Sequence, residues 1–179
     1  RDNRGMIELI LGGARSGKSQ LAERRAVASG LAVSCIVTGE ARDAEMARRI
    51  AHHQARRPAG WAVIEEPLHL AAALRRTAAA ERCLLVDCLT LWLSNLLFAD
   101  ADGGRLAAET AALREVLPTL PGRILLVSNE VGLGIVPLGE ETRRFVDEAG
   151  RLHQQLAALA DRVTFVAAGL PLTLKGSAE

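Results

Sequence analysis

The chain has 179 residues, of which 49% are hydrophobic, 24% are charged and 3% are aromatic. This length and composition fit a single globular domain over residues 1–179, and they exclude a disordered or fibrous protein. With 22 basic and 21 acidic residues the formal net charge is +1, which argues against a partner such as nucleic acid that needs a strongly basic protein.

The cysteine usage and the apolar runs are typical of a cytoplasmic protein. Cys35, Cys83 and Cys88 are odd in number and form no Cys-x-x-Cys pair, as expected of reduced, buried thiols. No apolar run reaches the roughly 18 residues of a membrane helix, so we expect no stable membrane insertion. Residues 1–5 lack the apolar stretch of a signal peptide and are interpreted as a short extension.

Predicted strands and helices alternate along the chain. In order, we expect a strand at 7–11, a helix at 18–29, a strand at 31–38, a helix at 41–57, a strand at 61–66, a helix at 68–80, a strand at 83–87, helices at 89–99 and 105–117, a strand at 124–129, a long helix ending near 161, and strands at 163–168 and 172–175. Strands that are apolar throughout predict an α/β fold, with a mainly parallel sheet and helices on both faces. Ligands of such sheets bind beyond the carboxyl ends of the strands.

A phosphate-binding loop follows the first predicted strand. The pattern Gly-x4-Gly-Lys-Ser is a complete Walker A motif, made of Gly12, Gly13, Ala14, Arg15, Ser16, Gly17, Lys18 and Ser19. Its glycines let backbone N–H groups surround a phosphate at the N-terminus of the next helix. Lys18 is expected to reach the β and γ phosphates, and the Ser19 hydroxyl to bind Mg²⁺. The motif predicts a nucleoside triphosphate site without saying which nucleotide is used.

Asp87 is the predicted second ligand of Mg²⁺. The carboxylate that partners a Walker A motif ends a neighbouring buried strand, where it holds the metal directly or through water. The run CLLVD places Asp87 in that position, and the same side chain suits the cap of the following helix. The chain has no Asn-Lys-x-Asp motif of the kind that reads guanine in switch GTPases, which disfavours a nucleotide-dependent switch.

Two adjacent histidines, His52 and His53, lie in the arginine-rich segment 41–57. On a helix Arg48 is four positions from His52, so the two share a face. Arg49 and His53 are related in the same way. An imidazole can attack phosphorus, and arginines stabilise the charge on a pentavalent transition state. The pattern by itself leaves a second interpretation open, a solvated charged face without a catalytic role.

Five segments occur in a fixed order: GGARSGKS, DAEMARRIAHHQARRPAGW, LLVDCLTLWLSNLL, VSNEVGLGIVP and GLPLTLK. Together they resemble the bifunctional adenosylcobinamide kinase / adenosylcobinamide-phosphate guanylyltransferase family of cobalamin biosynthesis. The spacings His-His-x4-Pro-x2-Trp and Asn-Glu-Val-Gly-x-Gly-Ile-Val-Pro carry most of the resemblance, because the Walker A motif is generic. The resemblance covers about Met6 to Lys175 and implies a recombinase-like P-loop NTPase fold assembled as a homotrimer.

The resemblance implies two reactions. In the first, ATP or GTP phosphorylates the aminopropanol hydroxyl of adenosylcobinamide. In the second, GTP gives GMP to a histidine and then to adenosylcobinamide phosphate, which yields adenosylcobinamide-GDP and pyrophosphate. The covalent histidine matches His52, with Lys18 acting on the phosphates and His53 orienting the nucleotide. The other nucleotide-contacting positions of the family match Thr38, Gly39, Glu40, Glu65 and Asp87. Many relatives have Glu at the position that Asp87 occupies in this chain. They commonly have Asn-Gln at the positions of His153 and Gln154.

Two other classes of function stay open on the sequence. A simple small-molecule kinase would use segment 41–57 as a phosphate-clamping lid and would form no covalent nucleotide adduct. A non-enzymatic module would bind nucleotide without needing an acceptor alcohol. Only the bifunctional transferase accounts for both of the specific spacings.

Overall fold

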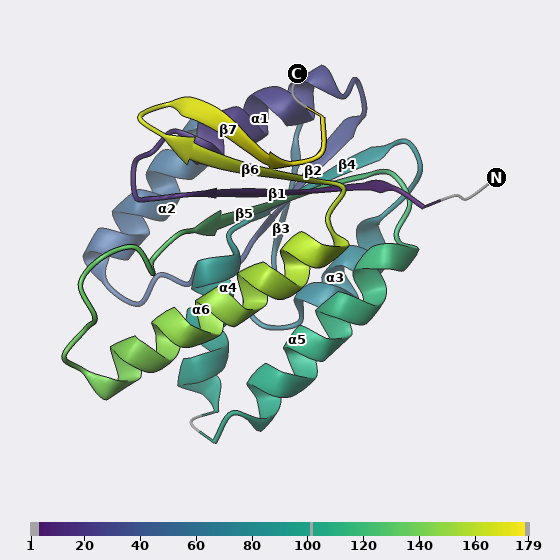
Figure 1. Cartoon of the computed structure of the whole chain (residues 1–179). Coiled ribbons are helices and arrows are strands. Elements are labelled where there is room, and N and C mark those ends of the chain that lie inside the picture. The colour runs from purple at the N-terminus through teal and green to yellow at the C-terminus, as the bar shows by residue number, and fades with distance from the viewer. Residues whose placement is uncertain (1–3, 101, 178–179) are drawn as a thin grey trace.

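The computed structural model describes residues 4–100 and 102–177 and confirms the predicted α/β fold (Figure 1). Its seven-stranded sheet has the order β3-β2-β4-β5-β1-β6-β7, in which β7 alone runs antiparallel to its neighbour. The strands are β1 (Met6–Gly12), β2 (Ala32–Val37), β3 (Ala62–Glu65), β4 (Arg82–Asp87), β5 (Arg123–Asn129), β6 (Arg162–Ala167) and β7 (Leu170–Lys175). The α-helices are α1 (Lys18–Ala28), α2 (Ala44–Arg56), α3 (Leu70–Thr77), α4 (Leu89–Ala99), α5 (Gly104–Val116) and α6 (Glu140–Leu159), with a 3-10 turn at Leu117–Thr119.

The sheet has a hydrophobic core on each face. Helices α3, α4, α5 and α6 pack together against one face, while α1 covers the other (Figure 1). Strand β1 serves both cores because its side chains alternate. Leu9 and Leu11 enter the larger core, whereas Ile10 packs against the α1 side. Glu8 faces the α1 side too, and it is buried in an ion pair with Arg25 of α1.

Strand β5 lies between the strand that precedes the phosphate loop and the strand that ends at Asp87. Gly12 of β1 is in register with Asn129 of β5, whereas Asp87 of β4 is in register with Val127 of β5. The expectation that Asp87 ends a strand next to the phosphate-loop strand is therefore wrong. Strand order depends on packing between distant segments, which the succession of apolar runs does not fix. Two strand spacings put β1 and β4 about 10 Å apart, so the phosphate loop and Asp87 lie on either side of the carboxyl end of β5.

The ends of the elements differ from the prediction by a few residues. Helix α2 begins at Ala44 rather than at residue 41, because Asp43 is its N-cap and accepts a hydrogen bond from the Met46 backbone N at 2.7 Å. Residues 1–3 of the predicted N-terminal extension lie outside the described residues. Among the residues that are described, no helix is both long and apolar enough to cross a membrane. In the same part of the chain the three cysteines are buried free thiols, as predicted.

Candidate active site

The phosphate loop turns between β1 and α1 through two residues with positive φ. Arg15 has a φ of 53° and Gly17 a φ of 96°. A Cβ atom on Gly17 would lie 3.1 Å from the Cα of Gly169, so both the conformation and the space favour glycine here. The Gly169 backbone N donates to the Ser16 carbonyl at 2.7 Å. The turn between β6 and β7 therefore supports the phosphate loop through this hydrogen bond.

Lys18 is buried beneath the loop that it serves. Its side-chain Nζ donates to the Gly13 carbonyl at 3.0 Å, and the residue is only 8% exposed. Burial lowers the pKa of Lys18, and the nearby Cys88 and Asp87 side chains oppose that shift. A desolvated ammonium group interacts strongly with an entering anion. The position of Lys18 therefore suits the β and γ phosphates of a triphosphate.

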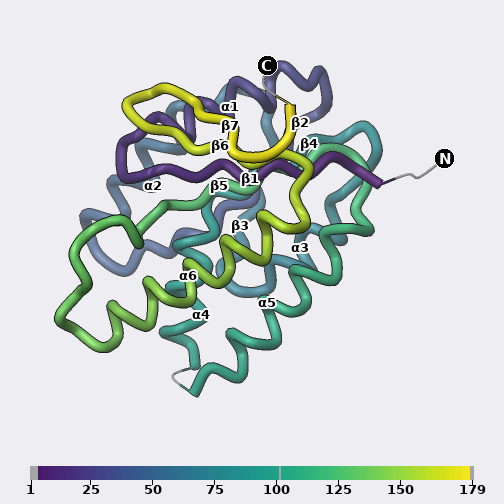
Figure 2. The backbone as a smooth tube through the Cα atoms, in the orientation of Figure 1, coloured from purple at the N-terminus to yellow at the C-terminus, as the bar shows by residue number. Residues whose placement is uncertain are grey.

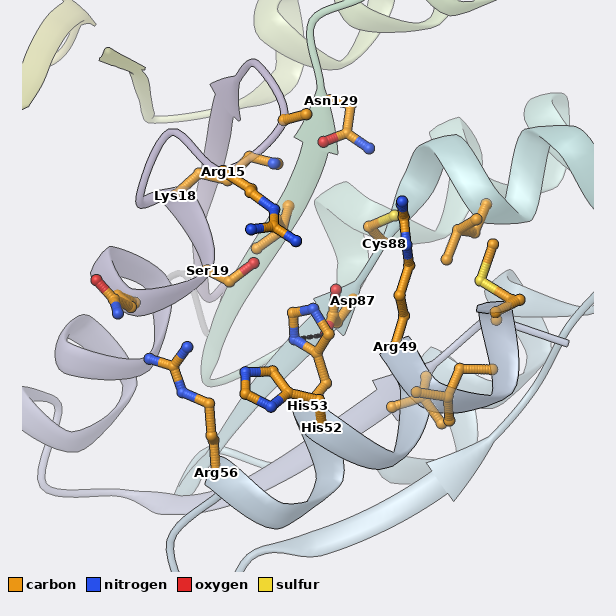
Figure 3. A pocket seen from close by; sticks show the side chains of 18 of the residues that line it. Arg15, Lys18, Ser19, Arg49, His52, His53, Arg56, Asp87, Cys88 and Asn129 are labelled. Carbon is orange, nitrogen blue, oxygen red and sulfur yellow. Dashed lines mark ion pairs between the residues drawn. The ribbon is translucent and has the colours of Figure 1, made fainter. Parts of the chain in front are cut away.

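Helix α2 brings the two histidines to the pocket that the phosphate loop lines. His52 and His53 line this pocket together with Lys18 and Ser19. Figure 3 shows both imidazole rings on the side of α2 that faces Ser19 and Asp87. The ring centroids are 6.4 Å apart, with the planes at 82°. The phosphate loop and the histidine pair, which are far apart in the sequence, thus line one cavity.

Side chains at the two ends of α2, rather than a buried face, hold the helix in place. Within its described residues, 44–56, none is buried. Before the helix, Arg42 donates to Asn95 Oδ1 at 3.0 Å and lies 4.2 Å over the ring of Phe98. After it, the side chain of Arg57 is 8% exposed and donates to Asp87 Oδ2 at 3.4 Å. The contacts of Arg42 and Arg57 therefore fix the two ends of α2 beside the pocket.

The pocket has a volume of about 900 Å³ and a cationic lining, and this size is typical of small-molecule sites. Its described lining includes six basic side chains, those of Arg15, Lys18, Arg48, Arg49, Arg56 and Arg57. Two carboxylates, Glu45 and Asp87, accompany them. The excess of positive charge favours a polyanionic ligand such as a triphosphate.

Asp87 and Ser19 supply oxygen ligands of the kind that Mg²⁺ prefers. Ser19 follows Lys18 at the start of α1, and its hydroxyl points into the cavity on the side of Asp87 (Figure 3). His53 Nδ1 also lies 3.9 Å from Asp87 Oδ2. Among the described residues no group of three or more His, Cys, Asp or Glu side chains is placed to hold a metal. Mg²⁺ is commonly held by one or two protein oxygens together with phosphates and water.

Of the four other residues predicted to contact the nucleotide, one lines the pocket and three do not. Gly39 lines the pocket, whereas Thr38 is fully buried and donates its hydroxyl to the Cys88 carbonyl at 2.6 Å. Glu40 is exposed and pairs with Arg42 at 3.2 Å. Glu65 ends the edge strand β3. Among the described residues, the pocket lining leaves out Thr38, Glu40 and Glu65.

Sequence reasoning included Arg57 in the arginine-rich segment 41–57 that could clamp a triphosphate, and it left Asn129 undecided. The structure places Arg57 in the pocket lining. Asn129 suited substrate contact and turn formation equally on the sequence. It lines the pocket, and both its backbone N and its Nδ2 donate to Thr90 Oγ1, at 3.3 and 3.1 Å.

His153 of α6 contacts Ser128 near the carboxyl end of β5 and Glu130 just after it. Its Nε2 is 2.7 Å from Ser128 Oγ, and its Nδ1 is 3.9 Å from Glu130 Oε2. The residue is 7% exposed. Burial lowers the pKa of His153 below its ordinary value of 6.5, while the Glu130 carboxylate opposes the shift. The folded protein therefore favours the neutral imidazole.

We expect His153 to make the fold less stable in mild acid. Below about pH 6.5 the unfolded chain binds a proton at this residue more readily than the folded chain does, so the free energy of unfolding falls as pH decreases. Urea unfolding at pH 7.5, 6.5 and 5.5 measures this loss. His153→Asn keeps a polar partner for Ser128 without a titrating group, so it is expected to lose stability less steeply than the wild type. Equal slopes for the two proteins would show that His153 contributes nothing to the pH dependence.

A glycine-containing loop and a helix N-terminus at the carboxyl ends of a mainly parallel sheet are the features of the P-loop class of folds. Among solved structures, the RadB recombinase has a similar fold, with a TM-score of 0.54 and 16% sequence identity over 90% of this chain and 74% of that chain. This likeness concerns the fold alone.

The chain belongs to the cobinamide kinase / cobinamide phosphate guanyltransferase family, whose model matches residues 8–174. It is 67% identical over 171 residues to the bifunctional adenosylcobalamin biosynthesis protein CobP of Pseudomonas aeruginosa, covering 96% of this chain and 98% of the relative. It is 39% identical over 182 residues to the bifunctional adenosylcobalamin biosynthesis protein CobU of Salmonella typhimurium, covering 95% and 100% of the two chains. The resemblance predicted from the sequence is confirmed, and the chain is a member of a family of enzymes.

Proposed function

We propose that this chain phosphorylates adenosylcobinamide and then transfers GMP to adenosylcobinamide phosphate, as a step of adenosylcobalamin biosynthesis. The observation that carries the proposal is the shared cavity, in which the triphosphate loop and His52 lie among arginine side chains. One site can therefore present the γ-phosphorus of a triphosphate to an acceptor alcohol and the α-phosphorus of GTP to a histidine.

In the kinase step the hydroxyl oxygen of the acceptor attacks the γ-phosphorus of ATP or GTP. A new P–O bond forms, the bond to the β,γ-bridging oxygen breaks, a nucleoside diphosphate leaves, and the hydroxyl proton passes to solvent water. Lys18 and the loop N–H groups stabilise the charge on the phosphate oxygens. Mg²⁺, held by Ser19 and Asp87, would neutralise further phosphate charge when it is bound.

In the guanylyl step a ring nitrogen of His52 attacks the α-phosphorus of GTP. The bond to the α,β-bridging oxygen breaks, pyrophosphate leaves and the imidazole loses a proton. A phosphate oxygen of adenosylcobinamide phosphate then attacks the same phosphorus, the P–N bond breaks, and the histidine regains its proton. Arg48, Arg49 and Arg56, which line the cavity beside His52, stabilise the negative charge on the phosphoryl oxygens in both halves of the reaction.

The other predicted nucleotide contacts have different roles in this proposal. Gly39 and His53 contact the bound nucleotide, while Thr38 supports the cavity wall through its hydrogen bond to Cys88. Glu40 follows β2 and Glu65 ends β3; we assign both to the part of the nucleotide away from the triphosphate, because neither lines the pocket beside the phosphate loop. Asp87 has a second role, because it fixes Arg57 as well as offering an oxygen to the metal.

We also propose that the enzyme is a cytoplasmic homotrimer. The three buried free thiols support a reducing compartment. The exposed leucines on edge strand β7, at positions 170, 172 and 174, are 71%, 60% and 57% exposed. A row of bulky apolar side chains on an edge strand is a suitable subunit contact.

Two labels on the nucleotide test the proposed reactions. The protein is incubated with Mg²⁺ and GTP labelled at the α-phosphate, denatured, and examined for protein-bound label that resists alkali and is lost in acid. In parallel, γ-labelled ATP or GTP is supplied with adenosylcobinamide, and label is sought in the corrinoid. The bifunctional enzyme gives both signals. A plain kinase gives only the second, and a nucleotide-binding module gives neither.

A further inference from the structure

The segment between β5 and α6, residues 131–139, exposes bulky apolar side chains. Ile135 and Leu138 are each 98% exposed, Leu133 is 79% exposed and Val136 is 72% exposed. We call these four side chains and the segment that carries them the apolar loop. Water-exposed apolar groups gathered in so short a segment mark a binding surface more often than an ordinary solvent-facing loop.

Both ends of the apolar loop are attached to the body of the protein. At the start, Val131 packs against the larger core and the Gly132 backbone N donates to Glu130 Oε1 at 2.7 Å. At the end, Arg143 Nη1 donates to the Pro137 carbonyl at 3.0 Å. The exposed side chains therefore project from a loop whose ends are fixed by packing and hydrogen bonds.

The apolar loop begins at the edge of the nucleotide pocket. Asn129 lines that pocket, and the Glu130 backbone N donates to the carbonyl of Gly12, the first residue of the phosphate loop, at 2.9 Å. In Figures 1 and 2 the loop extends beyond the carboxyl end of β5, at the same end of the sheet as the phosphate loop and α2. A molecule resting on the apolar loop would thus lie at the same end of the sheet as the reacting phosphate.

We propose that the apolar loop is the docking surface for the corrin ring of the acceptor. This inference rests on the proposed function, since it assigns a place to the second substrate of that reaction. The nucleotide pocket has a cationic lining suited to phosphate, whereas a corrinoid is a wide macrocycle with largely apolar faces and amide groups around its rim. Leu133, Ile135 and Val136 cover such a face, and the aminopropanol arm of the ring reaches past Asn129 to the phosphate.

A second copy of the chain is the competing occupant of the apolar loop. The leucine row of β7 already offers an apolar surface for a subunit contact, and β7 is three strands away from β5 in the sheet. The apolar loop, in contrast, is continuous with the nucleotide pocket through Asn129 and Glu130. That continuity is why we assign the loop to the acceptor.

The test is a double variant, Leu133→Ser with Ile135→Ser, examined for each half of the reaction. We expect the KM for adenosylcobinamide in the kinase assay to rise roughly tenfold or more, because apolar contact with the ring is lost. Retention of cobinamide by the protein in equilibrium dialysis, followed by the colour of the corrin, should fall in parallel. Self-labelling by α-labelled GTP needs no acceptor, so it should stay within about twofold of the wild type.

Two control variants accompany the double variant. Val27→Ser removes an apolar side chain that is 59% exposed on α1 and should leave every readout unchanged. Leu133→Ile with Ile135→Leu keeps the surface apolar and should restore the KM. An unchanged KM in the serine variant would overturn the proposal, and so would a fall in native mass, which would assign the loop to a second copy. A wild type that does not self-label would count against the covalent guanylyl step alone, because the loop experiment is read in the kinase assay.

Discussion

Replacing His52 by alanine is expected to abolish the covalent guanylyl adduct and to slow guanylyl transfer by about 10⁴-fold or more. Without the imidazole nitrogen, no group at this position attacks the α-phosphorus of GTP. The kinase step uses the γ-phosphorus and an acceptor oxygen, so it should continue. Protein-bound label from α-labelled GTP and phosphorylation of adenosylcobinamide, measured on the same preparation, separate the two effects.

His53→Ala is the matched control for this experiment. His53 follows His52 on α2 and lines the same pocket. Its Nδ1 lies 3.9 Å from Asp87 Oδ2, and we assign it an orienting role. We expect this variant to keep the covalent label and to turn over more slowly. Loss of label in His53→Ala with label retained in His52→Ala would exchange the roles of the two histidines. Label retained in both variants would place the covalent bond elsewhere.

Replacing Lys18 by methionine is expected to lower both activities by about 10²- to 10³-fold, the usual effect of losing one preorganised donor to a transition-state oxygen. Both reactions start from a bound triphosphate, and Lys18 lies buried at the base of its loop. Initial rates of corrinoid phosphorylation and of self-labelling measure the two losses. Because the lysine charge is desolvated in the fold, thermal unfolding of the variant should occur at the same or a higher temperature.

Lys175→Met provides the comparison for Lys18→Met. Lys175 lies on β7, where its Nζ donates to the Ala157 and Ala158 carbonyls at 2.9 and 3.1 Å. This variant should retain both activities. A Lys18→Met protein that lost the kinase reaction but kept full self-labelling would show that the phosphate loop serves only one of the two reactions.

Local patterns were sufficient to predict the elements and the phosphate loop. The Walker A motif predicts its own backbone conformation, because a strand end, a glycine turn and a helix N-terminus follow one another within Gly12 to Ser19. Asp87 was recognisable because it ends a buried apolar run. The apolar runs also predicted the strands of the sheet, down to the short final strand that the structure shows as β7.

Contacts between distant segments were not accessible from these patterns. The insertion of β5 between β1 and β4 depends on how the whole sheet packs. Thr38 follows a strand at the correct edge of the sheet, yet its side chain turns inward to Cys88, whose backbone lies 50 positions later in the sequence. The assignment of His52 came from resemblance to a family and not from spacing, because paired histidines on a charged helix have no distinctive geometry of their own.

Helix α2 contributes side chains to the active site but, among the described residues, none to the two hydrophobic cores. None of its described residues, 44–56, is buried, whereas the sheet and the other helices contain the two cores. Substitutions at exposed sites away from special contacts usually change stability little. The helix that carries His52 and three pocket arginines can therefore vary in sequence without weakening the fold. It is the segment in which an altered preference for nucleotide could evolve, or be engineered, at the smallest cost in stability.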